Sequence, residues 1–204
     1  MALKDISNLE KTDKMMDEDQ YWELVARSLK NSEDEDEQEA YLIAELSKLS
    51  PQEMIGFRLR TDKLLYDSYG SDLWCAAYLM NGGCSDDCFE YFRLWVISRG
   101  KDFFYKAKAN PDSLIELAEE DRAYFEFEMF WYVALEAFKN MTGKDLYDYI
   151  DVEKFTTRES NYPQFEFNWK EDKPETMKAI CPKLFEKYWA EENDIYQIER
   201  QTTE

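Results

Sequence analysis

Apolar residues recur at helical spacing along much of this chain, and the repeats begin at residues that favour helix starts. The apolar side chains of residues 18–30 fall on one helical face, and Asp17 stands just before them at the N-cap position. In SPQEMIGFRLRTDKLLYDS, Ser50 is a second N-cap, Pro51 takes the first helical position, and Glu53 completes a capping box. Both segments predict amphipathic helices with defined starts.

Three further segments predict helices that are largely buried. Residues 71–80 are short and strongly apolar, and residues 182–190 carry an apolar stripe behind a proline. Residues 123–140 are almost continuously apolar, which predicts a central helix that stops at Gly143, although the alternation in YFEFEMF is also typical of a strand.

After Asp151 the helical spacing disappears. Residues 152–175 are rich in turn formers, so we expect a mostly irregular segment there. The whole pattern predicts an all-α fold, a single bundle of about eight helices. We place that domain at residues 17–190, with polar tails at residues 1–16 and 191–204.

Composition fits one domain but adds a strong charge. The 204 residues are 44% hydrophobic, which is enough for a sizeable core. The chain has 45 acidic and 25 basic residues, a formal charge of −20, and the excess is shared by both halves. Such a protein should be repelled by nucleic acid and by anionic membranes and should favour a basic partner. The alternative is that the acidity only keeps the protein soluble.

Missing and scarce residue types remove several kinds of chemistry. The chain has no histidine, which excludes Ser-His-Asp and Cys-His nucleophiles and histidine-containing metal sites. The cysteines are Cys75, Cys84, Cys88 and Cys181, and their spacing does not predict a zinc site. The chain starts with a polar segment and has no run of 18 apolar residues, so we expect a cytoplasmic protein with reduced thiols and no cofactor.

The densest stretch is LMNGGCSDDCFEYFRLWVISRG, residues 79–100, which reads as a loop and a well-capped helix. Ser85 is the natural N-cap, and Asp86 and Asp87 lie in the first turn. Two acids at this helix start argue against phosphate binding. Asp86, Asp87 and Glu90 could bind a hard cation, but they do not form a calcium-binding loop, so we predict no metal site.

Arg93 falls in the middle of this helix among aromatic residues. We expect it either to be held by Glu90 and a second carboxylate or to bind a ligand. The stretch as a whole is our candidate ligand or partner site. Its members are Asn81, Ser85, Asp86, Asp87, Glu90 and Arg93.

An acidic run near residue 35 is a second candidate surface. Ser32 can cap the helix that follows, which would place Glu35 at the capping-box position and the other acids in the first turn. The run is either a solvated helix start or a docking surface for a basic partner. Its members are Glu33, Asp34, Glu35, Asp36 and Glu37.

Three stretches resemble a known family. YLMNGGCSDDCFEYFRLWVISRGKDFFYKAKANPDSL, the opening DEDQYWELV and the late CPKLFEKYW are similar to the DUF4240 family of uncharacterised bacterial proteins. The resemblance covers roughly residues 17–190. Because the family is uncharacterised, it implies no activity and assigns no catalytic residue, and neither Cys84 nor Cys88 is taken as a family requirement.

Two functional hypotheses follow. The first is an acidic protein-binding module without enzymatic activity, one version being an immunity- or antitoxin-type inhibitor of a basic toxin. The second is a small-molecule binder or enzyme that gathers Asn81, Asp86, Asp87, Arg93 and Glu128 around a pocket. Convergence of these side chains on an open cleft would favour the second hypothesis. A third reading is a structural or regulatory domain whose surface matters only inside one organism.

Overall fold

The computed structural model describes residues 3–118 and 122–189, and these residues form a helical bundle. They contain no β-strand, only the isolated bridges Thr12–Ile150 and Lys170–Lys173, so the predicted all-α class is confirmed. The α-helices are α1 (Glu18–Lys30), α2 (Glu35–Leu46), α3 (Pro51–Asp67), α4 (Ser71–Met80), α5 (Asp86–Ser98), α6 (Lys101–Ala109), α7 (Val133–Thr142), α8 (Pro174–Ile180) and α9 (Pro182–Leu184). Short 3₁₀ turns η1 (Pro111–Leu117), η2 (Glu128–Trp131), η3 (Leu146–Tyr149) and η4 (Glu159–Asn161) and the π-helical turn η5 (Phe185–Trp189) connect or extend them.

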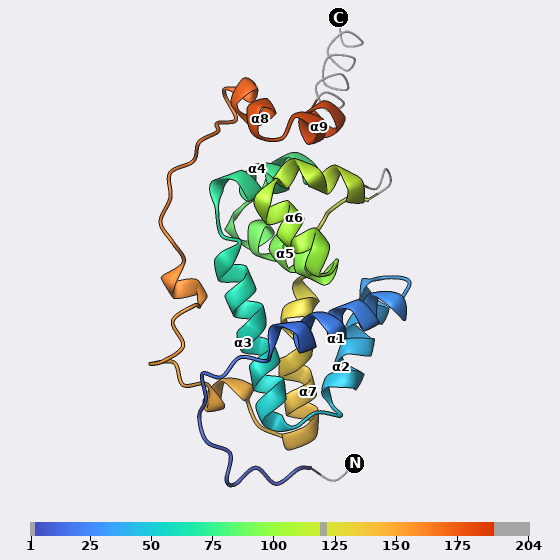
Figure 1. Ribbon diagram of the computed structural model, residues 1–204, viewed down its shortest axis with the longest axis vertical. Coiled ribbons are helices and arrows are strands. Elements are labelled where there is room, and N and C mark those ends of the chain that lie inside the picture. The colour runs from blue at the N-terminus through green and yellow to red at the C-terminus, as the bar shows by residue number, and fades with distance from the viewer. Residues whose placement is uncertain (1–2, 119–121, 190–204) are drawn as a thin grey trace, which may run out of the picture.

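The bundle has two ends joined by α3 (Figure 1). At one end α7 packs against α2 and α3, and at the other α4, α5 and α6 gather beneath α8 and α9. The largest buried side chains, led by Trp95, Arg93 and Tyr21, lie inside both ends. One core therefore supports the whole described chain.

Helix starts follow the local signals closely. The carboxylate of Asp17 accepts the N–H groups of Asp19 and Gln20 at the start of α1. Ser50 and Glu53 form the expected capping box at α3. A capping box gives hydrogen-bond partners to two backbone N–H groups that have none within the helix, and this fixes where α3 begins.

The start of α2 corrects the sequence prediction. Its N-cap is Asp34, whose carboxylate accepts the N–H of Glu37, rather than Ser32. The carboxylate of Glu37 in turn accepts the N–H of Glu33. Ser32 instead donates its hydroxyl to the carbonyl of Ser28, which also accepts the N–H of Asn31 at the end of α1.

The helix expected over residues 123–140 begins only at Val133. Phe125 and Phe127 are both buried and lie in a stretch without regular secondary structure. The N–H of Phe127 donates to the carbonyl of Tyr91, so a contact with α5 replaces a helical hydrogen bond there. The helical stop at Gly143 is confirmed, with φ of 68° at its C-cap.

The segment ahead of α1 lies against the bundle. The N–H of Met16 donates to the carbonyl of Gly56, and Arg60 donates two hydrogen bonds to the carbonyl of Met16. Met16 itself is buried. The C-terminal tail predicted for residues 191–204 lies outside the described residues.

Gly56 makes that approach possible, and we expect Gly56→Ala to destabilise the protein. A Cβ at this position would lie 2.9 Å from the backbone nitrogen of Met16, too close without a shift of the chain. Alanine normally favours a helix interior, so a loss of about 1–2 kcal/mol in the free energy of unfolding would mark the clash. Gly70→Ala is the matched control because nothing lies within 4 Å of its Cβ. If urea unfolding gave Gly56→Ala a higher free energy of unfolding than the wild type, this packing would be contradicted.

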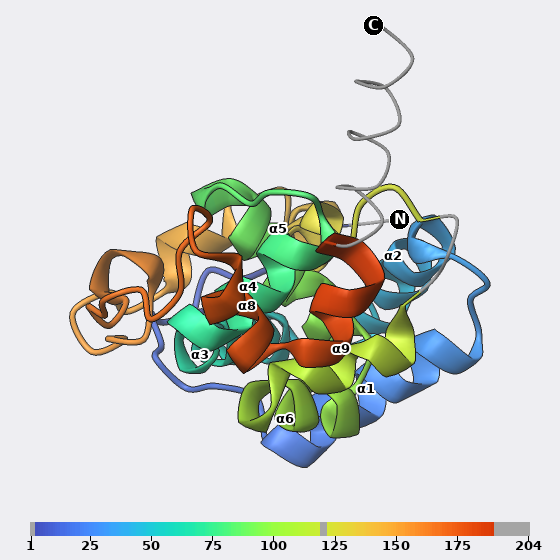
Figure 2. The same cartoon turned by 90° about the horizontal axis from the view of Figure 1, so that it is seen from above.

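Residues 151–173, here called the arm, follow an irregular path interrupted only by η4, which confirms the irregular segment that was predicted. The arm runs along the length of the bundle to α8, on the side away from α1 and α2 (Figures 1 and 2). Its aromatic residues hold it there: Tyr162 stacks on Tyr69 at 4.4 Å, and Trp169 donates its indole N–H to the carbonyl of Ser71. The arm thus forms a wall beside α3 and α5.

Among the described residues, none of the helices combines the length and apolar character needed to cross a membrane.

Candidate functional site

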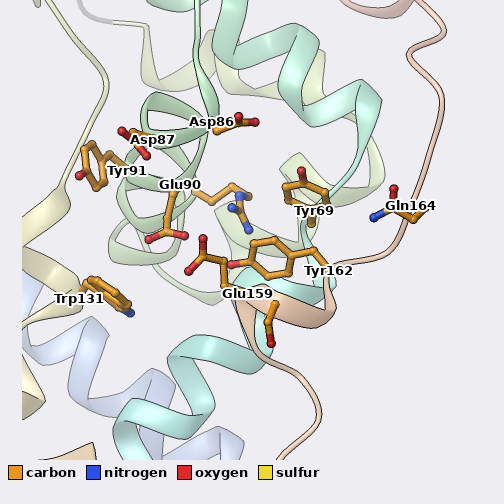
Figure 3. A pocket seen from close by; sticks show the side chains of 11 residues that line it. Tyr69, Asp86, Asp87, Glu90, Tyr91, Trp131, Glu159, Tyr162 and Gln164 are labelled. Carbon is orange, nitrogen blue, oxygen red and sulfur yellow. The ribbon is translucent and has the colours of Figure 1, made fainter.

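A hollow of about 500 Å³ opens where α5 faces the arm, and we call it the acidic pocket (Figure 3). One wall comes from α5, a second from the arm, and single residues from the turn between α3 and α4 and from η2 complete it. Its lining residues are Tyr69, Asp86, Asp87, Glu90, Tyr91, Arg93, Trp131, Glu159, Ser160, Tyr162 and Gln164.

Four of the six residues in the predicted candidate site line this pocket, namely Asp86, Asp87, Glu90 and Arg93. The other two, Asn81 and Ser85, do not line it. The side-chain oxygen of Asn81 accepts the N–H of Phe125, and the hydroxyl of Ser85 accepts the N–H of Cys88 as the N-cap of α5. These two hold the surrounding backbone in place.

Arg93 is held differently from the sequence prediction. Its side chain is 1% exposed, yet no described carboxylate lies within ion-pair distance of it. Its Nε donates to the carbonyl of Phe89 and its Nη1 to the carbonyl of Leu65, at 2.6 Å. Rings of Phe89, Tyr69 and Tyr162 lie 4.6 to 5.0 Å from the guanidinium carbon. The expected clamp by Glu90 and a second acid is therefore wrong: carbonyl oxygens and aromatic faces hold the charge.

The carboxylates of the pocket are left without ion pairs. Asp86, Asp87 and Glu159 are exposed and Glu90 is half-buried, and none forms an ion pair with a described lysine or arginine. The carboxylate ends of Glu90 and Glu159 point toward one another from α5 and the arm (Figure 3). Burial raises the pKa of Glu90, Arg93 partly offsets it, and the charge of Glu159 raises it further. Four acids against one buried guanidinium make the pocket attractive to a cation.

A smaller hollow of about 290 Å³ adjoins the pocket and shares five wall residues with it, Glu90 and Trp131 among them. Arg58 and Asp62 lie at its base. The guanidinium of Arg58 stacks 4.1 Å from the Trp131 ring centre, donates to the Trp131 carbonyl, and bonds Asp62 at 2.6 Å. Burial raises the pKa of Asp62 from 3.8 to about 6, although Arg58 opposes the shift.

Asp62 should therefore give stability a measurable pH dependence. Because its folded pKa lies above the unfolded value, the folded protein binds the extra proton between about pH 4 and pH 6. Its contribution falls as pH rises through that window, so the free energy of unfolding should be about 1 kcal/mol higher at pH 5 than at pH 7. Urea unfolding of the wild type and Asp62→Asn at both pH values isolates this contribution. Equal pH dependence in the two proteins would exclude Asp62 as its source.

The acidic side chains were also compared with what a metal ion needs. Within residues 3–118 and 122–189, no group of three or more histidine, cysteine, aspartate or glutamate side chains could hold a metal ion. The acids of the pocket are spread around its rim and do not converge on one point. We therefore consider organic cations as ligands.

Cys84 and Cys88 are joined in a disulfide, so the expectation of reduced thiols is wrong for this pair. Cys75 and Cys181 are free and buried. Gly82 and Gly83 have φ of 64° and 128° and turn the chain back over the start of α5. Their turn leaves the Cα atoms of Cys84 and Cys88 5.2 Å apart, within the range of a disulfide.

The acidic run at residues 33–37 is mainly used locally and does not line the pocket. Asp34 and Glu37 cap the start of α2, and Glu35 forms ion pairs with Arg99 and Arg122. Glu33 and Asp36 are exposed. Docking of a basic partner on this run stays a prediction.

The structure adds seven residues to the pocket that sequence reasoning missed. The aromatic spacing of the arm, with Tyr162 ahead of Phe165, Phe167 and Trp169, signalled that this irregular stretch packs on something. It did not reveal which helix it would face. The additional residues are Tyr69, Tyr91, Trp131, Glu159, Ser160, Tyr162 and Gln164.

Comparison with known proteins places most of the bundle in one family. The family described as "Protein of unknown function (DUF4240)" matches residues 16–140, from just before α1 into α7, and α5 lies inside the match. The arm and the stretch CPKLFEKYW lie beyond it. Neither the curated proteins nor the solved structures contain a match to this chain. Since the matched region covers more than half of the sequence and includes its densest motif, the chain belongs to the DUF4240 family.

Proposed function

We propose that the protein is a binding module for a positively charged partner and that the acidic pocket is its contact site. The observation that carries the proposal is the set of four pocket carboxylates without ion pairs to a described lysine or arginine. Arg93 lies beside them, but its Nε and Nη1 donate to backbone carbonyls and it forms no ion pair with these carboxylates. A cationic group entering the pocket would gain the pairing that these carboxylates lack.

The finer form of the proposal names a basic protein in the cytoplasm as the partner. The formal charge of −20 would speed association with such a partner and would disfavour nucleic acid. One version is an immunity- or antitoxin-type inhibitor that covers the active site of a basic toxin. An acidic surface placed over a basic active site would block access to it and match its charge.

Affinity capture with a matched pair of baits tests this proposal. Wild-type protein, the pocket variant Glu90→Gln/Glu159→Gln and the control Glu153→Gln/Glu175→Gln would be exposed to native lysate at about 50 mM salt, where screening is weak. Glu153 and Glu175 are exposed and line no pocket named here, so the control removes equal charge elsewhere. We expect the wild-type and control baits to capture a basic protein that the pocket variant does not capture. Rising salt should release this protein from both baits. Equal capture by all three baits would contradict it.

A second candidate is a small-molecule binder or an enzyme that uses the pocket carboxylates. The observation that favours it is the pair of facing carboxylates, Glu90 and Glu159, beside the aromatic rings of Tyr69 and Tyr162. Two carboxyl groups that face each other across a pocket can serve as general acid and general base. A thermal-shift screen of small organic cations and sugars distinguishes this candidate: a hit that stabilises the wild type but not Glu90→Gln/Glu159→Gln would favour it over a protein partner.

A further inference from the structure

We propose that the partner is a basic polypeptide that crosses η2 and places one cationic side chain in the acidic pocket and another in a second acidic hollow beside it. This inference rests on the proposed function and narrows it, because a single small cation cannot occupy both hollows. The second hollow contains Glu39 and Glu136, to which the sequence analysis gave no role, and Glu128, which it expected beside Asp86 and Arg93.

The second hollow, which we call the α2/α7 hollow, measures about 470 Å³ and lies between α2, η2 and α7. Its carboxylates are Glu39, Glu128 and Glu136, and its lining contains no lysine or arginine. None of the three forms an ion pair with a described basic residue. Burial raises the pKa of Glu39, and the charges of Asp36 and Glu136 raise it further. This hollow, like the first, holds negative charge without a counter-charge.

The turn η2 forms a common wall between the two hollows. Trp131, at its end, lines the acidic pocket, whereas Glu128 and Met129, at its start, line the α2/α7 hollow. Burial raises the pKa of Tyr91 in the acidic pocket, and the charge of Glu128 in the other hollow raises it further, so the two hollows influence each other electrostatically. Phe130 between them is fully buried, so η2 is anchored in the core and presents a fixed ridge.

The ridge itself suits contact with a chain. Met129 is 42% exposed, one of the few large apolar side chains at the described surface. A polypeptide laid over it would bury apolar surface at the ridge and pair its charges on either side. The charge complementarity is strong, since the two hollows together present seven carboxylates and one guanidinium, two of whose N–H groups donate to backbone carbonyls. The observations therefore favour a basic polypeptide over an isolated cation.

Synthetic peptides with one or two arginines test the inference. The first probe is an acetylated, amidated peptide with a single arginine. The second is a series of such peptides in which two arginines are separated by between about one and nine glycines. The spacer length is varied because a flexible linker must match the span of the two sites. Binding to the full-length protein would be measured by titration calorimetry at about 50 mM salt. We expect at least one spacer to bind about tenfold or more tightly than the single-arginine peptide, because the second contact becomes intramolecular.

Variants separate this inference from the proposed function. Glu128→Gln/Glu136→Gln should reduce the ratio of two-arginine to one-arginine affinity to about two or less, the statistical factor of two equivalent groups, whereas Glu153→Gln/Glu175→Gln should leave the ratio high. Two results would overturn the inference while the proposed function stands. In the first, no spacer length raises the ratio of two-arginine to one-arginine affinity above two in the wild type. In the second, Glu128→Gln/Glu136→Gln does not reduce that ratio. If neither kind of peptide binds, or if Glu90→Gln/Glu159→Gln binds them as the wild type does, the proposed function itself fails.

Discussion

Arg93→Met is expected to lower the free energy of unfolding by about 3 kcal/mol and to loosen the arm. The substitution removes the 2.6 Å hydrogen bond to the carbonyl of Leu65 and leaves that buried oxygen only the longer bond, at 3.2 Å, from the Ser68 hydroxyl. It also removes the charge that the rings of Tyr69 and Tyr162 face. Since Tyr162 belongs to the arm and Tyr69 to the bundle, the guanidinium joins these two parts of the molecule.

Chemical unfolding and limited proteolysis measure the two effects separately. Urea unfolding gives the global loss, and trypsin cleavage after Lys154 or Arg158 reports opening of the arm. Arg27→Met is the matched control because Arg27 is an exposed arginine with only long ion pairs, at 3.8 and 3.9 Å, and should change stability by less than about 0.5 kcal/mol. If Arg93→Met lowered the free energy of unfolding no more than Arg27→Met and did not increase cleavage in the arm, Arg93 would not hold the arm to the bundle.

Glu90→Gln/Glu159→Gln is expected to weaken the binding of a basic partner by about a hundredfold and yet to stabilise the protein alone. Removing two carboxylates from a cation site costs about 1.4 kcal/mol each, which is tenfold in affinity per group. In the free protein the same carboxylates face each other without a counter-ion, and burial disfavours the charge of Glu90. Neutral glutamines remove that repulsion, so the free energy of unfolding should rise by about 0.5 kcal/mol.

A variant that raises the free energy of unfolding and yet lowers the affinity for a partner distinguishes a recognition site from an ordinary acidic surface. The two measurements are urea unfolding of the free protein and calorimetric titration with the two-arginine peptide or with the captured partner. Glu153→Gln/Glu175→Gln lowers the net charge equally and should leave affinity within about threefold of the wild type, because exposed charges far from the contact act only through screened fields. A loss of affinity that is equal in both variants would indicate general electrostatic attraction and no defined pocket.

Helix boundaries were the most predictable part of this fold because they depend on neighbouring residues. Asp17, Ser50 and Ser85 cap α1, α3 and α5 as their local patterns predicted. The cap at α2 was misplaced by two residues because Ser32 and Asp34 are both good caps, and the end of α1 decides between them. The late start of α7 had the opposite cause, since the N–H of Phe127 donates to the carbonyl of Tyr91, a residue distant in the sequence, and not to a helical partner.

Four of the eleven residues that line the acidic pocket were predicted and seven were not, and the difference lies in their distance along the sequence. Asp86, Asp87, Glu90 and Arg93 lie on one capped helix, so sequence proximity brings them together. Glu159 and Tyr162 reach the pocket only because an irregular segment packs back along the bundle. The partners of Arg93 are carbonyls and rings, which no charge pattern in the sequence distinguishes from carboxylates.

The two walls of the acidic pocket relate differently to the family match. The helix that supplies its first wall lies inside the matched region, whereas the arm lies beyond residue 140, where that match ends. Irregular surface segments tolerate exchange better than packed helices do. Replacing the arm would therefore reshape one wall while α5 keeps its carboxylates. The arm is thus the part of the pocket through which the choice of partner can be altered without rebuilding the helical core.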